Sequence, residues 1–374
     1  MLLVVRAHVQ FSWSSGPTRA GVVPALPDQV TTITDLGRVG VHLFLVISGF
    51  CIHLRWARAA DPAQGLDFVP FWRRRLIRLY PPYLVAVLLS VAGHFVLFGL
   101  LGGATTIAGM FGYDTLDQLW SDLLVHALLF QNFTDASERI GNGVFWTLAL
   151  EEQLYALYFL LLAVRRRFGW GPALTMVVTT TLVWRSLPLI APMPAHWNDL
   201  GPARWVEWTL GALAVEMFFG HARLSRIWHS WITVAGLTAL AVAINVESAV
   251  KAVPILSLAT DLAFGLAFFA MVLALVRTER ASTPATNRRY PLTFIGTFSY
   301  SIYLVHLPLI NGAKHLLVRV GVEPSPLATG LVLGSSAVAT LVGAYVFHVI
   351  FERPAILASR RSGRREAAPA RRSA

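Results

Sequence analysis

The side chains in this sequence with the clearest potential for chemistry are ionisable groups inside long apolar segments. His8 stands in the first such segment, LLVVRAHVQF. An ionisable side chain surrounded by hydrocarbon costs free energy, so it usually faces protein or water rather than lipid. An imidazole titrates near neutral pH and can remove the proton of a hydroxyl that attacks a thioester. His8 is therefore a candidate general base, and a packed, hydrogen-bonded histidine is the alternative that its position leaves open.

Two adjacent acids form a second candidate group. Glu151 and Glu152 lie in WTLALEEQLYALY, an otherwise apolar segment. Neighbouring residues on a helix point about 100 degrees apart, so two lipid-facing carboxylates are a costly explanation for the pair. Glu151 shares one stripe of the helix with Tyr155 and Tyr158. This stripe predicts a polar interior around the first glutamate.

A further polar stripe runs through FSYSIYLVHLPLI, closer to the C-terminus. His306 lies there, with Ser299, Tyr300 and Tyr303 on nearby helical turns. Hydroxyl and imidazole groups gathered on one face of an apolar helix favour hydrogen bonds between helices. His42, near the start of the apolar segment 36–54, is a weaker candidate of the same kind.

Arginines cluster in the segment FVPFWRRRLIRLY, where Arg73, Arg74, Arg75 and Arg78 fall within six residues. One interpretation is that they anchor a helix at the membrane surface, as most arginines beside a span do. The other is a phosphate clamp, because guanidinium groups three residues apart share a helix face and bind phosphate oxygens through two parallel hydrogen bonds. CoA carries several phosphates and is a natural cytoplasmic ligand for such a clamp.

Helices that cross a bilayer must position these groups. The chain has 374 residues, 55% of them hydrophobic and only 14% charged, with a mean hydropathy of +0.59, which is too apolar for a soluble domain of this size. A span needs about 20 mostly apolar residues. The sequence predicts an all-α polytopic transmembrane bundle of about ten spans. Nine lie near 36–54, 80–102, 143–164, 171–191, 204–220, 230–247, 254–276, 292–313 and 326–350, and a short tenth candidate covers residues 1–13.

The charge distribution predicts how the bundle is oriented. The net charge of +11 would suggest nucleic acid in a soluble protein, but alternating the sides of the membrane places 22 of the 31 Lys and Arg residues on one face. This asymmetry is typical of cytoplasmic loops, so both termini are predicted to be cytoplasmic and no nucleic-acid partner is expected. The same topology puts the imidazoles and glutamates in the outer halves of their spans and the arginine cluster at the inner face.

The remaining features of the sequence indicate how the chain is divided into domains. Residues 1–358 are predicted to form one membrane domain, and the basic segment 359–374 is predicted to be a disordered cytoplasmic tail. The segment FVPFWRRRLIRLY is expected to be a helix at the cytoplasmic interface, with Pro81 and Pro82 starting the next span. Cys51 is the only cysteine, which excludes an intrachain disulfide and a CxxC pair, and no metal site is expected.

Several motifs together resemble the acyltransferase-3 family of membrane O-acyltransferases. His8 resembles the family's first-helix histidine, and GVHLFLVISGF resembles its G-V-x-L-F-F-V-x-S-G-F segment. FWRRRLIRLYPPY is similar to F-x-x-R-R-x-x-R-[IL]-x-P, and WTLALEEQLY to W-S-L-x-x-E-x-x-F-Y. The late S-Y-S-x-Y-L-x-H-x-P segment and a closing FERP are present as well. In this sequence the five segments are 40–50, 71–83, 146–155, 296–308 and 351–354.

The resemblance implies a multi-pass enzyme of the bacterial cytoplasmic membrane that acylates surface glycans or glycosylated metabolites. It places the family's R-x-x-R pair on Arg75 and Arg78. Two features depart from the family pattern. The family's arginine ten or eleven residues before the histidine would precede Met1, and His42 stands where an acid is common. We also expect this chain to lack the fused extracellular esterase domain that some relatives carry.

The leading hypothesis is transfer of a short acyl group, chiefly acetyl, from acyl-CoA to a hydroxyl of a sugar-containing acceptor. His8 is the expected base, Glu151 orients the imidazole or polarises the acceptor, and Arg74 joins the clamp. Glu152, His42 and the polar stripe 299–306 are expected on the acceptor or oxyanion side. A proton-coupled secondary transporter or flippase is the alternative from another class, and a lipid-binding sensor is a third. Binding of CoA distinguishes the first hypothesis from both others.

Overall fold

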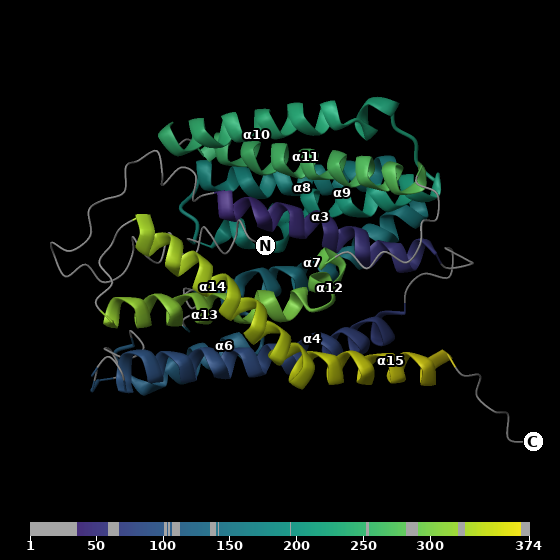
Figure 1. The fold of residues 1–374 in the computed structure, drawn as a ribbon. Coiled ribbons are helices and arrows are strands. Elements are labelled where there is room, and N and C mark those ends of the chain that lie inside the picture. The colour runs from purple at the N-terminus through teal and green to yellow at the C-terminus, as the bar shows by residue number, and fades with distance from the viewer. Residues whose placement is uncertain are drawn as a thin grey trace, which may run out of the picture. The chain divides into compact units, whose positions relative to one another are not determined.

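The computed structural model describes residues 36–58, 67–100, 103, 105–106, 113–134, 140, 142–194, 196–251, 254–281, 291–320 and 326–367. Within these ranges every regular element is helical and no strand occurs, which confirms the all-α prediction (Figure 1). His8 and the short first span lie outside the described residues. The described helices form two compact units. The first unit contains residues 67–146 and 291–367, and the second contains 36–58 and 147–281.

The second unit is a bundle of six helices, with α3 and α9 packed along each other at its centre. Helix α11 packs on both α3 and α9, while α8 covers α9 and α10 lies along α11 (Figure 1). Large buried side chains such as Trp205, Trp208, Phe264 and Phe269 fill the interior. The helices are α3 (Leu36–Ala57), α7 (Trp146–Phe168), α8 (Trp170–Ser186), α9 (Gly201–Phe219), α10 (Trp231–Lys251) and α11 (Pro254–Ala281).

Two glycines allow α3 and α9 to approach closely. A Cβ atom built on Gly49 of α3 would lie 1.9 Å from the carbonyl oxygen of Trp208, and one on Gly211 of α9 would lie 1.9 Å from that of Val46. Small residues are typical of helix contacts in membranes, because close backbone approach increases van der Waals contact where no hydrophobic effect drives helices together. The contact fixes the register of the two helices that carry most of the unit's polar side chains.

The first unit is built on α4 (Phe68–His94), which continues as the π-helical segment η2 (Phe95–Leu100). Helix α13 packs against α4 and α14, and α15 runs along α4. The remaining elements are α6 (Leu116–Ala127), η3 (Gln131–Phe133), α12 (Pro291–Thr297), α13 (Ser299–Arg319), α14 (Pro326–Phe347), η8 (His348–Glu352) and α15 (Arg353–Ala367).

Helix α4 differs from its prediction because it is continuous across Pro81 and Pro82. The sequence predicted an interfacial helix that ends there and a new span that begins with the prolines. Each proline lacks an N–H group and so removes one helical hydrogen bond, but membrane helices tolerate prolines because neighbouring helices and side chains compensate. The arginine cluster and the span therefore share one helix axis.

The C-terminal segment also differs from its prediction. Residues 359–367 belong to α15, whereas the sequence predicted disorder from Ser359 onward. The reason is a contact distant in sequence: Ser359 Oγ donates to the backbone oxygen of Arg74 at 2.8 Å, and Ala355 and Ser362 are buried. Short-range patterning does not reveal that α4 offers a surface for this segment.

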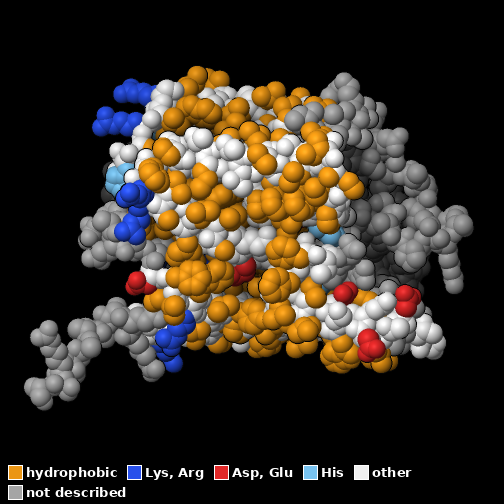
Figure 2. Space-filling model, turned by 180° about the vertical axis from the view of Figure 1, so that it is seen from behind, with side chains coloured by type: hydrophobic (Ala, Val, Ile, Leu, Met, Phe, Trp, Pro, Cys, Tyr) orange, Lys and Arg blue, Asp and Glu red, His pale blue; other side chains and the backbone are white. Residues whose placement is uncertain are grey.

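Five of the described helices are long and apolar enough to cross a membrane: Val39–Ala57, Phe68–Leu97, Trp146–Phe168, Leu256–Thr278 and Gly334–Gly363. Hydrophobic side chains also cover most of the face drawn in Figure 2. These features agree with a membrane protein. By length and composition, the described part of the chain thus has fewer candidate spans than the ten predicted. One reason is that α8 has only 17 residues, and another is that α9 contains three charged residues. The total of ten and the orientation of the termini stay predictions.

Replacing Gly211 with alanine should lower the free energy of unfolding by about 1–3 kcal/mol, because the new methyl group would meet the Val46 carbonyl. The measurement is thermal unfolding of the purified protein in detergent. Gly236→Ala is the matched control, since Gly236 lies within α10 and a Cβ atom there meets open space. Equal thermal midpoints for the two variants would contradict the close contact between α3 and α9.

Candidate active site

The carboxylate of Glu151 is held by side chains from two helices of the second unit. Ser48 Oγ, on α3, donates to Glu151 Oε1 at 2.7 Å, and the hydroxyl of Tyr155 donates to the same oxygen. The Ser48 hydroxyl in turn accepts from Trp208 Nε1 on α9 at 3.3 Å. Glu151 is thus part of a polar chain inside the unit. Glu152 is half-buried beside it on α7.

His42 lies between two carboxylates in the interior of the second unit. Its Nδ1 is 2.7 Å from Glu207 Oε2 and its Nε2 is 3.5 Å from Asp261 Oδ1. The ring is 6% exposed and stacks on Phe264. The sequence identified this histidine as a weak candidate on the acceptor side, but its partners on α9 and α11 were not foreseen.

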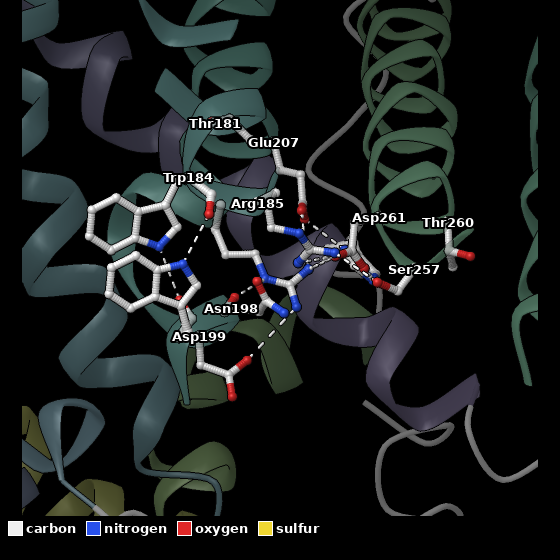
Figure 3. A network of polar contacts seen from close by, with 12 residues as sticks. Thr181, Trp184, Arg185, Asn198, Asp199, Glu207, Ser257, Thr260 and Asp261 are labelled. Atoms are coloured by element: carbon white, nitrogen blue, oxygen red, sulfur yellow. Dashed lines mark hydrogen bonds and ion pairs between the residues drawn. The ribbon is translucent and has the colours of Figure 1, made fainter. Parts of the chain in front are cut away.

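Asp261 is the centre of an ionic network, shown in Figure 3. Its Oδ2 lies 2.8 Å from Arg185 Nη1 and 2.6 Å from Arg204 Nη1, and Arg204 also reaches Glu207 at 3.3 Å. Arg204 also lies 3.8 Å from Asp199, so two arginines face three carboxylates in this network. Nearby, Trp184 and Trp197 stack with their centroids 4.0 Å apart, each donating its indole N–H to the other's backbone oxygen. The network joins α8, α9 and α11.

A second ionic cluster surrounds Glu216, toward the other end of α9. The side chain is fully buried, and its Oε1 lies 2.7 Å from His53 Nε2 and 3.0 Å from Arg165 Nη2. His221 contributes a further contact at 3.1 Å, and the Tyr158 hydroxyl bonds the other ring nitrogen of His53. The two tyrosines of the predicted stripe on α7 therefore have different partners. Tyr155 is hydrogen-bonded to Glu151, and Tyr158 is hydrogen-bonded to His53.

In the first unit, the late polar stripe ties α13 to backbone atoms of other segments. The Tyr300 hydroxyl donates to the Leu79 carbonyl at 2.9 Å, and the Tyr303 hydroxyl donates to that of Val144. His306 is fully buried, and its Nδ1 bonds the carbonyl of Tyr303 at 2.7 Å. Three of the four predicted residues therefore make internal contacts, and Ser299 is exposed at the start of the helix.

The buried serine of this stripe is Ser301, which the sequence did not single out. Its hydroxyl donates to Glu352 Oε2 at 2.6 Å, and the same oxygen lies 2.8 Å from His348 Nδ1. Glu352 belongs to the FERP segment, so two of the motifs quoted above meet in one hydrogen-bonded group. The sequence contained a signal for this contact, because a glutamate next to an apolar span, such as Glu352, needs a hydrogen-bond or ionic partner.

The arginine cluster lies in the first turns of α4. Arg75 is half-buried with its guanidinium carbon 4.8 Å from the centroid of the Phe71 ring, whereas Arg78, one turn further on, is exposed. Arg74 is half-buried, and its backbone oxygen accepts the hydrogen bond from Ser359 of α15. Exposed arginines of α15, Arg360 and Arg361, follow directly on the serine that contacts Arg74. No group of three metal-ligating side chains is placed to hold a metal ion within the described ranges.

Asp261→Ala should destabilise the protein by about 3–5 kcal/mol, since it leaves Arg185 and Arg204 without their shared carboxylate. Thermal unfolding in detergent is the measurement. Asp117→Ala, at an exposed site in the first turn of α6, is the control and should cost less than about 1 kcal/mol. An Asp261 variant as stable as the control would show that the two arginines do not depend on this carboxylate.

The comparisons with known proteins agree with the motifs. A family model described as an acyltransferase domain matches residues 1–349. The acyltransferase MdmB of Streptomyces mycarofaciens is 27% identical over 344 residues, which cover 86% of this chain and 81% of the relative. The peptidoglycan O-acetyltransferase OatA of Listeria monocytogenes is 27% identical over 330 residues, covering 83% of this chain.

The chain spans about half of the Listeria relative, 48% of its length. No solved structure is significantly similar to the chain. The family match nevertheless extends over residues 1–349, which include His8 and four of the five motif segments, while FERP at 351–354 follows directly after it. The chain belongs to the acyltransferase-3 family, and the protein is an acyltransferase.

Proposed function

We propose that the protein transfers a short acyl group, chiefly acetyl, from acyl-CoA to a hydroxyl of a sugar-containing acceptor at the bacterial cytoplasmic membrane. The observation that carries the proposal is the family match over residues 1–349, with a peptidoglycan O-acetyltransferase among the relatives. A transporter or flippase would not require this match to an acyltransferase family.

The proposed binding of the acyl donor, acyl-CoA, rests on residues of α4. Arg75 and Arg78 are three residues apart on a continuous helix, so their side chains leave the same face. Arg78 is exposed and free to meet a ligand from solvent. Planar guanidinium groups bind phosphate oxygens through paired hydrogen bonds, which suits the phosphates of CoA. Arg74 and the arginines of α15 add positive charge beside this pair.

His8 is the proposed general base. It takes the proton of the acceptor hydroxyl as the oxygen attacks the thioester carbonyl, a bond forms between oxygen and the acyl carbon, and the bond to sulfur breaks. The thiolate leaves and receives a proton, so the products are an ester and free CoA. Glu151 is proposed to assist by orienting or polarising a reacting group. Its carboxylate is held by the Ser48 and Tyr155 hydroxyls, which supports a fixed position for it.

His8→Ala should lower the rate of acetyl transfer by about 10²–10⁴-fold, the usual contribution of a positioned general base. The assay follows release of free CoA from acetyl-CoA in the presence of soluble oligosaccharide, together with label on the sugar. Binding of acetyl-CoA, measured by its protection against thermal unfolding, should be unchanged. His229→Ala, in the short helix η7 (Arg226–His229), is the control. Transfer that survives His8→Ala at the wild-type rate excludes this imidazole as the base.

The double variant Arg75→Ala/Arg78→Ala should weaken acetyl-CoA binding by at least about 100-fold, because each charge-assisted contact contributes about 1.5–3 kcal/mol. Acetyl-pantetheine has no nucleotide phosphates, and its affinity should not change. Arg223→Ala/Arg226→Ala is the matched control, since these exposed arginines have the same spacing elsewhere in the chain. Equal losses for both ligands would mean that the double variant damages the fold rather than a phosphate clamp.

A further inference from the structure

Three buried side chains of the first unit each carry one polar atom without a hydrogen-bond partner. They are His126 at the end of α6, Gln131 in η3 and Asn142 shortly before α7, and they are 1%, 0% and 1% exposed. The atoms are Nε2 of the histidine and the side-chain oxygens of the two amides. A buried polar atom without a partner destabilises the folded state, so these three atoms call for an explanation.

The other end of each side chain is fixed by a backbone carbonyl. His126 Nδ1 lies 2.8 Å from the Asp122 oxygen, Gln131 Nε2 lies 3.0 Å from the Phe145 oxygen, and Asn142 Nδ2 lies 2.9 Å from the Leu304 oxygen. A carbonyl oxygen can only accept, so the nitrogen that faces it must carry the hydrogen. This settles both amide orientations and the tautomer of the neutral imidazole.

The three remaining atoms are therefore all acceptors. Burial lowers the pKa of His126 below its ordinary value, so the ring is neutral at pH 7 and Nε2 keeps its lone pair. The oxygens of Gln131 and Asn142 are uncharged acceptors as well. The group presents three acceptor atoms, and none of the three donates.

Contacts around Tyr83 of α4 bring the first two side chains together. Its hydroxyl donates to the backbone carbonyl of His126 at 2.8 Å. The Tyr83 ring packs edge-on against Phe145, whose carbonyl holds Gln131. Asn142 begins the turn that ends at Phe145, and its amide also donates to Ser90, two helical turns along α4 from Tyr83. Hydrogen bonds and ring contacts thus connect the three residues at the junction of α4, α6 and α13.

The chemistry of the junction selects its ligand. Three neutral acceptors repel phosphate and carboxylate groups, which also offer acceptors, and they complement a molecule that donates several hydrogen bonds without carrying a negative charge. A sugar does so through its hydroxyl groups. Aromatic rings of Tyr80, Tyr83 and Phe145 contact one another in the same part of the unit.

We propose that this acceptor junction, defined by His126, Gln131 and Asn142, binds hydroxyl groups of the sugar that receives the acyl group. The proposal rests on the proposed function for the identity of the sugar as acyl acceptor. The binding step itself is independent of acyl transfer.

A matched pair of substitutions at His126 tests the proposal. The amide nitrogen of asparagine takes the place of Nδ1, so His126→Asn keeps the bond to Asp122 and removes the acceptor at Nε2. His126→Gln places an amide near Nε2 instead and can restore an acceptor there. His229→Asn in η7 is the control for the substitution itself.

The probe is a soluble N-acetylhexosamine oligosaccharide, and its binding is measured by protection against thermal unfolding with no acyl-CoA present. His126→Asn should weaken oligosaccharide binding about tenfold, the effect of losing one hydrogen bond, and His126→Gln should weaken it less. Gln131→Met should act like His126→Asn. In the transfer assay the KM for the oligosaccharide should rise by the same factor, while the KM for acetyl-CoA stays at the wild-type value.

The two proposals fail in different ways. Oligosaccharide binding that is lost in His126→Asn, in a protein that transfers no acetyl group to it, would support the junction and overturn the proposed function. Acetyl transfer with an unchanged KM for the oligosaccharide in both His126→Asn and Gln131→Met would support the proposed function and overturn the junction as its acceptor site. A rise in the KM for acetyl-CoA instead would also overturn it, since the junction would then serve the donor.

Discussion

The arrangement of polar side chains in this protein depends on the free energy of removing a charge from water. A buried ion without a partner costs several kcal/mol even after the protein relaxes around it. Within the second unit, the carboxylates of Glu207, Glu216 and Asp261 accordingly each meet an arginine, and each also meets a histidine. The partners come mostly from different helices, so satisfying the charges also fixes which helices are neighbours.

The pairing of buried charges matters more here than in a soluble protein, because lipid removes most of the hydrophobic driving force for helix packing. Apolar side chains gain little by leaving lipid for a helix interface, so close packing and polar pairs decide which helix faces meet. His42, Gly49 and His53 follow each other on α3 at intervals of seven and four residues, which places them on one face. That face meets α9, where the glycine allows close approach and the two histidines reach Glu207 and Glu216.

The first unit holds two chemically different groups of side chains. The arginines of α4 are cationic and suit anions, whereas the proposed acceptor junction presents buried hydrogen-bond acceptors and suits donors of hydrogen bonds. In the proposed reaction the donor, acyl-CoA, is highly charged, whereas the reacting hydroxyl of the acceptor is neutral. The phosphates of this donor would therefore favour the guanidinium groups over the neutral acceptors.

The sequence by itself determined the helical class, the membrane environment and the family. These properties depend on composition, on the length of apolar runs and on motifs such as FWRRRLIRLYPPY, and all of them are local in the chain. The approximate positions of helices such as α9 and α11 were predictable for the same reason. The roles of Arg74, Arg75 and Arg78 stay predictions.

Only the tertiary structure decided which polar residues meet. His42 and Glu207 are 165 residues apart, and Asn142 and Leu304 are 162 apart, so no local pattern joins them. The helix from Arg353 to Ala367 shows the same limit, because its last turns lie where the sequence shows only a basic tail. Local patterning records how much a residue prefers water or lipid, whereas the partner of a buried polar atom is set by the packing of distant helices.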